Sequence, residues 1–91
     1  MLEVVLSNQF KKDLKLASKR GYKLELLEKT VDKIANNIKL EEKYRDHALT
    51  GNYIGFRECH IQPDWLLVYR IENDELILFL SRTGSHSDLF N

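Results

Sequence analysis

Hydrophobic positions follow two different periods along the chain, helical in the first third and alternating in the last. The short apolar run Leu2–Leu6 is typical of a β-strand. Ser7 follows it and can cap a helix by accepting a hydrogen bond from a free backbone N–H group. Phe10, Leu14 and Ala17 then recur at helical spacing, so we predict a first helix directly after the strand.

A second amphipathic helix is predicted from Leu24 to Ile38, after a stop at Gly21. Its apolar residues form one stripe at helical spacing, which consists of Leu27, Val31, Ile34, Ala35 and Ile38. Lys and Glu residues stand between them and are expected to face solvent. Because the link around Gly21 is short, the two helices are expected to pack as an antiparallel hairpin.

The remaining residues predict a polar loop and then a meander of strands. Lys39–Asn52 lacks clear periodicity, which favours a loop. From there on apolar and polar residues alternate, and we predict three strands, at Tyr53–Ile61, Trp65–Ile71 and Leu76–Arg82. The connecting turns are predicted at Gln62-Pro63-Asp64 and at Asn73-Asp74. Such short turns make the three strands antiparallel.

These elements predict an α+β fold of one domain over all 91 residues, in the order β-α-α-β-β-β. A helical hairpin is expected on one face of a mainly antiparallel sheet. Successive strand residues face opposite sides, so Cys59 and Ile61 share the face expected to meet the helices. His60 then lies on the open face. Gly84 allows the chain to bend, so that His86 can fold back over the sheet.

Composition and charge narrow the class of protein. A single cysteine excludes an internal disulfide framework, and no apolar run approaches a membrane span or a signal peptide, so a soluble cytoplasmic protein is expected. The formal net charge is zero, but residues 1–39 carry nine Lys or Arg against five Asp or Glu. Residues 40–91 carry five against nine. Any attraction to phosphate would therefore come mainly from the N-terminal part. The alternative is that these lysines only form the solvent-exposed face of a helix.

Three histidines in the acidic part are the main candidates for chemistry. Imidazole can give and take a proton near neutral pH, since its ordinary pKa is about 6.5. His47, His60 and His86 occur together with the carboxylate of Asp64 and the guanidinium of Arg82. Two imidazoles, a carboxylate and an arginine can move protons around a phosphodiester and stabilise its charge without a metal ion.

Two other readings of these residues are disfavoured. The histidines lie 13 and 26 residues apart, which matches no standard zinc pattern, so no metal and no cofactor is predicted. Cys59 and His60 cannot form a nucleophilic pair, because adjacent strand residues point to opposite faces.

Three runs of residues jointly carry a family resemblance. Asp46–Gly51 has the pattern D-H-x-L-x-G, and Gly55–Tyr69 contains R-x-x-H-x-x-P-D-W. Arg82–Phe90 has the pattern R-T-G-x-H-x-x-L-F. At these separations the three patterns resemble the YafQ branch of the RelE superfamily, bacterial toxins of type II toxin–antitoxin pairs. The resemblance spans essentially the whole chain.

The resemblance implies a small ribosome-dependent endoribonuclease that cuts mRNA in the decoding A site. It also implies inhibition by a cognate antitoxin with a disordered or helical segment that wraps the toxin. The positions that match functional residues of the family are His47, His60, Asp64, Trp65, Arg82, His86 and Phe90. The free toxin is expected to be a monomer.

Roles follow from the chemistry of RNA, whose 2′-hydroxyl is the nucleophile. His60, helped or replaced by Asp64, is the predicted general base, and His86 is the predicted general acid. Arg82 is predicted to bind the phosphate, because its planar guanidinium can donate hydrogen bonds to two oxygens at once. A further role in catalysis is predicted for His47. Substrate contacts are predicted for Trp65, Phe90, Lys11 and Lys15, the two lysines through docking of the first helix on ribosomal RNA.

Each role has a structural alternative. His47 can brace its loop, Asp64 is a residue that turns favour, Trp65 can pack in the core, and Phe90 can be a packing latch. Two rival functions also remain. One is a non-catalytic module that binds an antitoxin and acts in repression of their operon, and the other is a ribonuclease that needs no ribosome.

Overall fold

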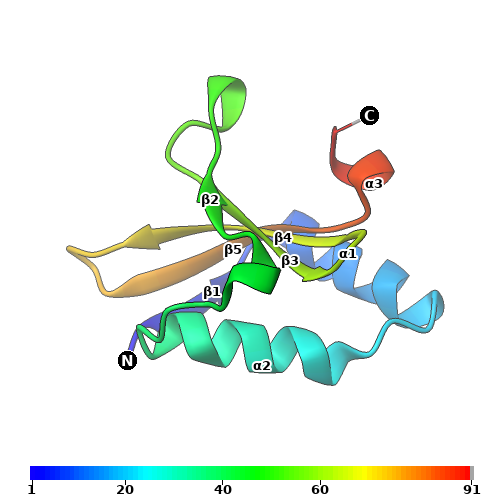
Figure 1. Cartoon of the computed structure of the whole chain (residues 1–91), viewed down its shortest axis with the longest axis horizontal. Helices are drawn as coiled ribbons and strands as arrows, with labels where there is room; N and C mark the ends of the chain where they lie inside the picture. Colours follow the sequence, from blue (N-terminus) through cyan, green and yellow to red (C-terminus); the bar gives the residue numbers. More distant parts are fainter. Residues whose placement is uncertain (91) are drawn as a thin grey trace.

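The computed structural model describes residues 1–90 as a mixed sheet with helices on both sides (Figure 1). The elements are β1 (Glu3–Leu6), α1 (Asn8–Lys19), α2 (Leu24–Ala35), η1 (Glu42–Tyr44), β2 (His47–Ala48), η2 (Gly51–Tyr53), β3 (Arg57–Gln62), β4 (Trp65–Glu72), β5 (Ile77–Gly84) and α3 (His86–Phe90). Here η denotes a 3-10 helix. Among these residues no helix is both long and apolar enough to cross a membrane.

The five strands lie in the order β1-β5-β4-β3-β2. Only β1 runs parallel to its neighbour, β5, and every other pair is antiparallel. The chain reverses direction between α1 and α2, and both helices lie on one side of the sheet (Figure 1). The predicted α+β fold with a helical hairpin on a mainly antiparallel sheet is confirmed.

The main core lies between this hairpin and the sheet. Cys59 and Leu67 are fully buried in it, and Ile61 packs against it, which confirms the predicted helix-facing side of β3. The other face carries a smaller core, in which Leu66, Val68 and Leu89 are buried. This face is therefore partly covered by α3, and the predicted open face is open only over part of its area.

Both ends of α1 follow the sequence signals, whereas the end of α2 does not. The Oγ atom of Ser7 accepts a hydrogen bond from the backbone N–H of Phe10 at 2.9 Å, as predicted for the cap. The prediction that α2 continues to Ile38 is wrong, because the helix ends at Ala35. Asn37 adopts a left-handed backbone with φ of 60°, and Ile38 is 54% exposed. A left-handed residue ends a helix by turning the chain away from its axis.

The segment predicted as one loop contains the short strand β2 and two 3-10 turns. The first strand of the meander begins at Arg57 and not at Tyr53, because Gly55 takes a left-handed backbone with φ of 93° just before it. The strand β5 extends to Gly84, beyond the predicted end at Arg82. Four residues, 73–76, connect β4 to β5, where a two-residue turn was predicted. The helix α3 was not predicted.

Candidate active site

A row of polar side chains crosses the second face of the sheet, from β2 over β3 to the start of α3. The Nε2 atoms of His47 and His60 lie 3.7 and 3.6 Å from the same carboxylate oxygen of Glu58. The His60 and His86 rings are 5.7 Å apart between centroids. Nδ1 of His86 lies 2.7 Å from Asp64. These five residues are called the histidine row below.

All three imidazoles are held through the same ring nitrogen. Nδ1 of His47 donates to the carbonyl oxygen of Arg45 at 2.6 Å, and Nδ1 of His60 to that of Pro63 at 3.2 Å. Nδ1 of His86 donates to the carboxylate of Asp64. Carbonyl and ionised carboxylate oxygens only accept, so each Nδ1 carries a hydrogen. Nε2 is therefore the nitrogen that each ring presents for proton transfer.

Glu58 is the functional candidate that sequence reasoning missed. It is only 6% exposed and lies between His47 and His60, which both turn Nε2 toward it. A signal was present, because Glu58 precedes His60 by two residues and therefore shares its face of the strand. Its pairing with His47 across β2 and β3 was not visible, since β2 itself was not predicted.

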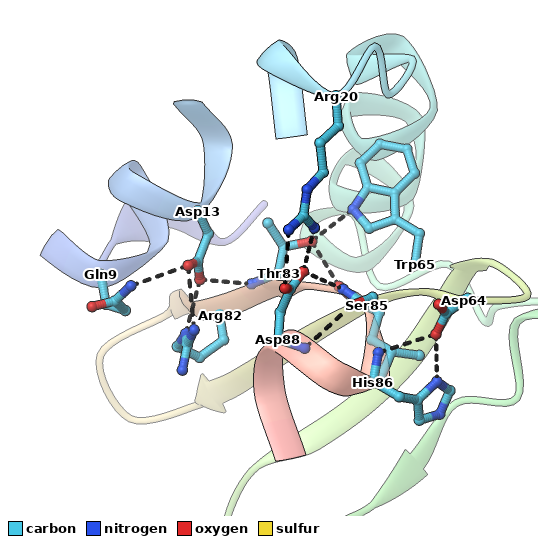
Figure 2. Close-up of polar contacts among 11 residues, drawn as sticks. Gln9, Asp13, Arg20, Asp64, Trp65, Arg82, Thr83, Ser85, His86 and Asp88 are labelled. Carbon is cyan, nitrogen blue, oxygen red and sulfur yellow. Dashed lines mark hydrogen bonds and ion pairs between the residues drawn. The ribbon is translucent and has the colours of Figure 1, made fainter. Parts of the chain in front are cut away.

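Asp64 fixes the start of α3 and the ring of His86 at the same time (Figure 2). One of its oxygens accepts from the backbone N–H of His86 at 3.0 Å and from Nδ1 of the same residue. The backbone N–H and the ring together hold the pKa of Asp64 below its usual value. A carboxylate that is occupied and easily ionised is a weak base, so its position favours His60 over Asp64 as the base.

Arg82 does not point its guanidinium at the histidine row. Nε and Nη2 donate to the two oxygens of Asp13 on α1, at 2.9 and 3.3 Å (Figure 2). This carboxylate raises the pKa of Arg82. Arg82 pairs with Val68, which pairs with Glu58 on the next strand, so the arginine lies two strands away from Glu58. A substrate phosphate would have to compete with Asp13 for it.

Trp65 lies in the core and not in the site. It is 2% exposed, and its Nε1 donates to Oγ1 of Thr83 at 2.9 Å. The Thr83 backbone N–H in turn donates to Asp13 at 3.1 Å, which joins Trp65 to the Arg82 contact (Figure 2). This placement supports the packing alternative for Trp65.

The other predicted substrate contacts lie at the surface. Phe90 ends α3, is 42% exposed and meets Tyr53 edge to face at 5.5 Å between ring centroids. Lys11 and Lys15 are exposed on α1, on the helix side of the sheet. They therefore lie on the side of the sheet opposite the histidine row.

Metal-ligating atoms do come together in the row, although the sequence spacing resembled no metal motif. Glu58, His60 and His86 each offer one ligand atom, and these atoms all lie within 4.8 Å of one another. Imidazole nitrogens and a carboxylate oxygen suit zinc or copper. The spacing argument was therefore insufficient, because the three residues meet through strand pairing and the bend at Gly84.

Comparisons with known proteins identify the family of this chain. Residues 2–91 match the family described as bacterial toxin of type II toxin-antitoxin system, YafQ. The chain belongs to this family. It is 39% identical over 89 residues to the mRNA interferase toxin YafQ of Escherichia coli strain K12, with 97% of this chain and 95% of the relative covered.

Solved structures of bacterial toxins agree in fold. A metal-bound toxin from Helicobacter pylori is 51% identical with a TM-score of 0.94, and the match covers 99% of this chain and all of that one. The toxin in a DinJ-YafQ complex from E. coli is 37% identical with a TM-score of 0.90, and both chains are fully covered. The predicted family is thus confirmed.

Proposed function

We propose that this single-domain toxin cuts mRNA on translating ribosomes in the bacterial cytoplasm and is neutralised by a cognate antitoxin. The activity of a relative supports this proposal, since the E. coli protein is an mRNA interferase. The antitoxin partner is supported by the DinJ-YafQ complex. We expect the free toxin to be a monomer. We expect cutting to require the ribosome, because a chain of zero net charge attracts bare RNA weakly.

The observation that carries the mechanism is the pair of anchored imidazoles. His60 and His86 are held through Nδ1 and lie side by side, with ring centroids 5.7 Å apart. In the proposed reaction Nε2 of His60 takes the proton of the 2′-hydroxyl, whose oxygen attacks the adjacent phosphorus. The bond from phosphorus to the 5′-oxygen breaks, and Nε2 of His86 donates a proton to that oxygen. The products are a 2′,3′-cyclic phosphate and a 5′-hydroxyl.

Glu58, His47 and Asp64 act through these two histidines. The Glu58 carboxylate faces Nε2 of His60 and stabilises the imidazolium that forms when His60 accepts the proton. His47 contacts the same carboxylate from the other side. Asp64 orients the ring of His86 and stabilises its charged form.

In this scheme Arg82 supplies positive charge for the phosphate once its guanidinium turns from Asp13 toward the histidine row. Two of its donors bind Asp13, while its Nη1 makes no hydrogen bond within residues 1–90. A guanidinium never deprotonates near neutral pH, so this free donor remains available to a phosphate oxygen. The structure supports this role less directly than those of His60 and His86.

A metal ion has no step in this scheme, although Glu58, His60 and His86 can hold one. A bound ion would occupy the nitrogens that must transfer protons. We therefore expect a chelator selective for zinc and copper, which leaves magnesium for the ribosome, to leave the cutting rate unchanged or to raise it. A loss of cutting that added zinc or copper restores would make the metal part of the reaction.

The test is primer extension on a defined mRNA with purified toxin, with and without programmed ribosomes. We expect in-frame cuts only when ribosomes are present, and a loss of about 10²–10⁴ in rate for His86→Ala. Cuts in both samples would identify a ribonuclease that needs no ribosome. Growth arrest that survives His86→Ala would favour the non-catalytic module that binds an antitoxin and acts on their operon.

A further inference from the structure

A cavity of about 680 Å³ opens beside His60 and His86 and leads away from the histidine row. Its walls are α2, η1 and the end of β3. It is called the basic groove below. Its volume lies within the range of about 300–1,000 Å³ that is typical of ligand sites, so it has room for more than an ion or a water molecule.

Positive charge is concentrated in this groove, although the chain as a whole has equal numbers of acidic and basic residues. Lys29 of α2, Lys43 of η1 and Arg45 contribute to its lining, and no Asp or Glu does. All three side chains are exposed, and none forms an ion pair within residues 1–90. A cleft lined by unpaired cations attracts anions.

A contact with Tyr44 holds the ammonium group of Lys43 at the groove. Nζ atoms of Lys33 and Lys43 lie 5.3 and 5.5 Å from the centroid of the Tyr44 ring, which attracts both ammonium groups. The acidic residue next to η1, Glu41, binds Lys33 at 3.4 Å and does not line the groove. Neither Glu41 nor its neighbour Glu42 lines the groove.

We propose that the basic groove binds the phosphodiester backbone of the substrate RNA strand on one side of the cut. This inference rests on the proposed ribonuclease function, which places the phosphodiester that is cut between His60 and His86. Lys29, Lys43 and Arg45 are then positioning residues that hold the neighbouring phosphates. They lie outside the first helix, where Lys11 and Lys15 were predicted to provide the RNA contacts.

An antitoxin segment is the rival occupant, because a free strand edge lies beside the groove. β2 pairs only with Arg57 and Glu58, so the rest of β3 has no strand neighbour on that side. An extended antitoxin segment could add a strand there. The RNA strand is favoured because the groove ends at both proton-transferring histidines, and because a row of phosphates matches three separate cations better than a main chain does.

The decisive variant is Lys29→Gln/Lys43→Gln, assayed by cutting of programmed ribosomes at several salt concentrations. Arg45 is left in place, because its carbonyl oxygen anchors His47. We expect KM to rise several-fold at low salt with kcat nearly unchanged. The slope of log KM against log salt should fall by about 1.4, since each phosphate contact on a single strand contributes about 0.7. The matched control is Lys23→Gln/Lys39→Gln, which removes two exposed lysines outside the groove.

The outcomes separate this inference from the function on which it rests. If folded wild-type toxin does not cut, the ribonuclease proposal has failed. If wild type cuts and the Lys29/Lys43 variant keeps its KM and slope, the groove is not the RNA site. An unchanged KM with weakened antitoxin binding would assign the groove to the antitoxin.

A binding measurement separates the message from ribosomal RNA as the source of the phosphates. The double variant should bind a short RNA, blocked by a 2′-deoxy nucleotide at the cut, more weakly than the control in low salt. If the affinity for this RNA is unchanged, while binding to ribosomes without message falls, the phosphates are ribosomal and the substrate-strand assignment is overturned.

Discussion

Single hydrogen bonds determine what each histidine of the row can do. Each Nδ1 is occupied by an acceptor, and each Nε2 is left for a proton transfer. Among these acceptors only that of His86 is a carboxylate, Asp64, and it also binds the backbone of the same residue. At the residue scale, Asp64 is therefore better placed to orient His86, the proposed general acid, than to act as the base.

The variant Asp64→Asn distinguishes these two roles. The amide oxygen can still accept from the backbone N–H of His86, so α3 should stay in place, while the charge beside the ring is lost. We expect a drop in kcat clearly smaller than that of His86→Ala, measured in the same ribosome assay. A loss equal to that of His60→Ala would instead identify Asp64 as the base.

The helix α3 is the element that completes the site, although it is short. It begins at His86, two residues after Gly84, whose backbone has φ of 154°. A Cβ atom at this position would lie 2.9 Å from a carboxylate oxygen of Asp88. Asp88 in turn accepts from the backbone N–H of Ser85 and from Arg20 of α1 (Figure 2). The bend and these bonds set the place of His86.

Gly84→Ala tests this bend. The new methyl group must push Asp88 aside, and the backbone is strained for a residue with a side chain. We expect kcat to fall at least tenfold, because His86 moves with α3. Circular dichroism should show an intact fold. Unchanged cutting by a folded Gly84→Ala toxin would mean that the position of His86 does not depend on this bend.

Asp88→Asn tests the charge that holds α3. The Arg20 guanidinium, helped by the Ser85 backbone N–H, lowers the pKa of Asp88 from 3.8 to about 2. A lowered pKa means that the ionised form stabilises the fold above pH 3.8, and that this stability is lost as the pH falls toward 2. After allowance for solvent screening, we expect the variant to lose about 1 kcal/mol of unfolding free energy at pH 7.

Urea unfolding of wild type and Asp88→Asn at pH 7, 5 and 3 checks this prediction. The difference between the two proteins should be constant from pH 7 to 5 and shrink at pH 3. A difference that stays the same at pH 3 would show that the charge of Asp88 is not its cause.

At the scale of the whole molecule, two hydrophobic cores of unequal size have different roles. The main core joins the helical hairpin to the sheet, whereas the smaller core only fastens α3 and the loop before β3 to the other face. Stability should therefore depend mainly on the first core, and the geometry of the site on the second.

Matched truncations in the two cores test this division. Leu67→Ala in the main core should cost about 2–5 kcal/mol of unfolding free energy. Leu89→Ala in the smaller core should cost less, because this side chain is nearer the surface, yet it should lower kcat by releasing α3. Urea unfolding and the ribosome assay measure both effects. A larger loss of stability for Leu89→Ala than for Leu67→Ala would contradict the division.

The sequence by itself determined the types and order of the main elements, the helix-facing side of β3 and the family. These depend on local signals, such as the cap at Ser7, the period of the apolar residues and the motifs around His60 and His86. Where the local signal was weak, as at Ile38 or before Arg57, the boundaries were wrong.

Only the tertiary structure decided which polar groups meet. Glu58 lies between two histidines because β2 pairs with β3, and Arg82 binds Asp13 because α1 crosses the end of β5. Trp65 is buried by the packing of the helical hairpin, which its motif does not reveal. Such contacts join residues far apart in the chain, so they depend on register, twist and packing, which no local pattern contains.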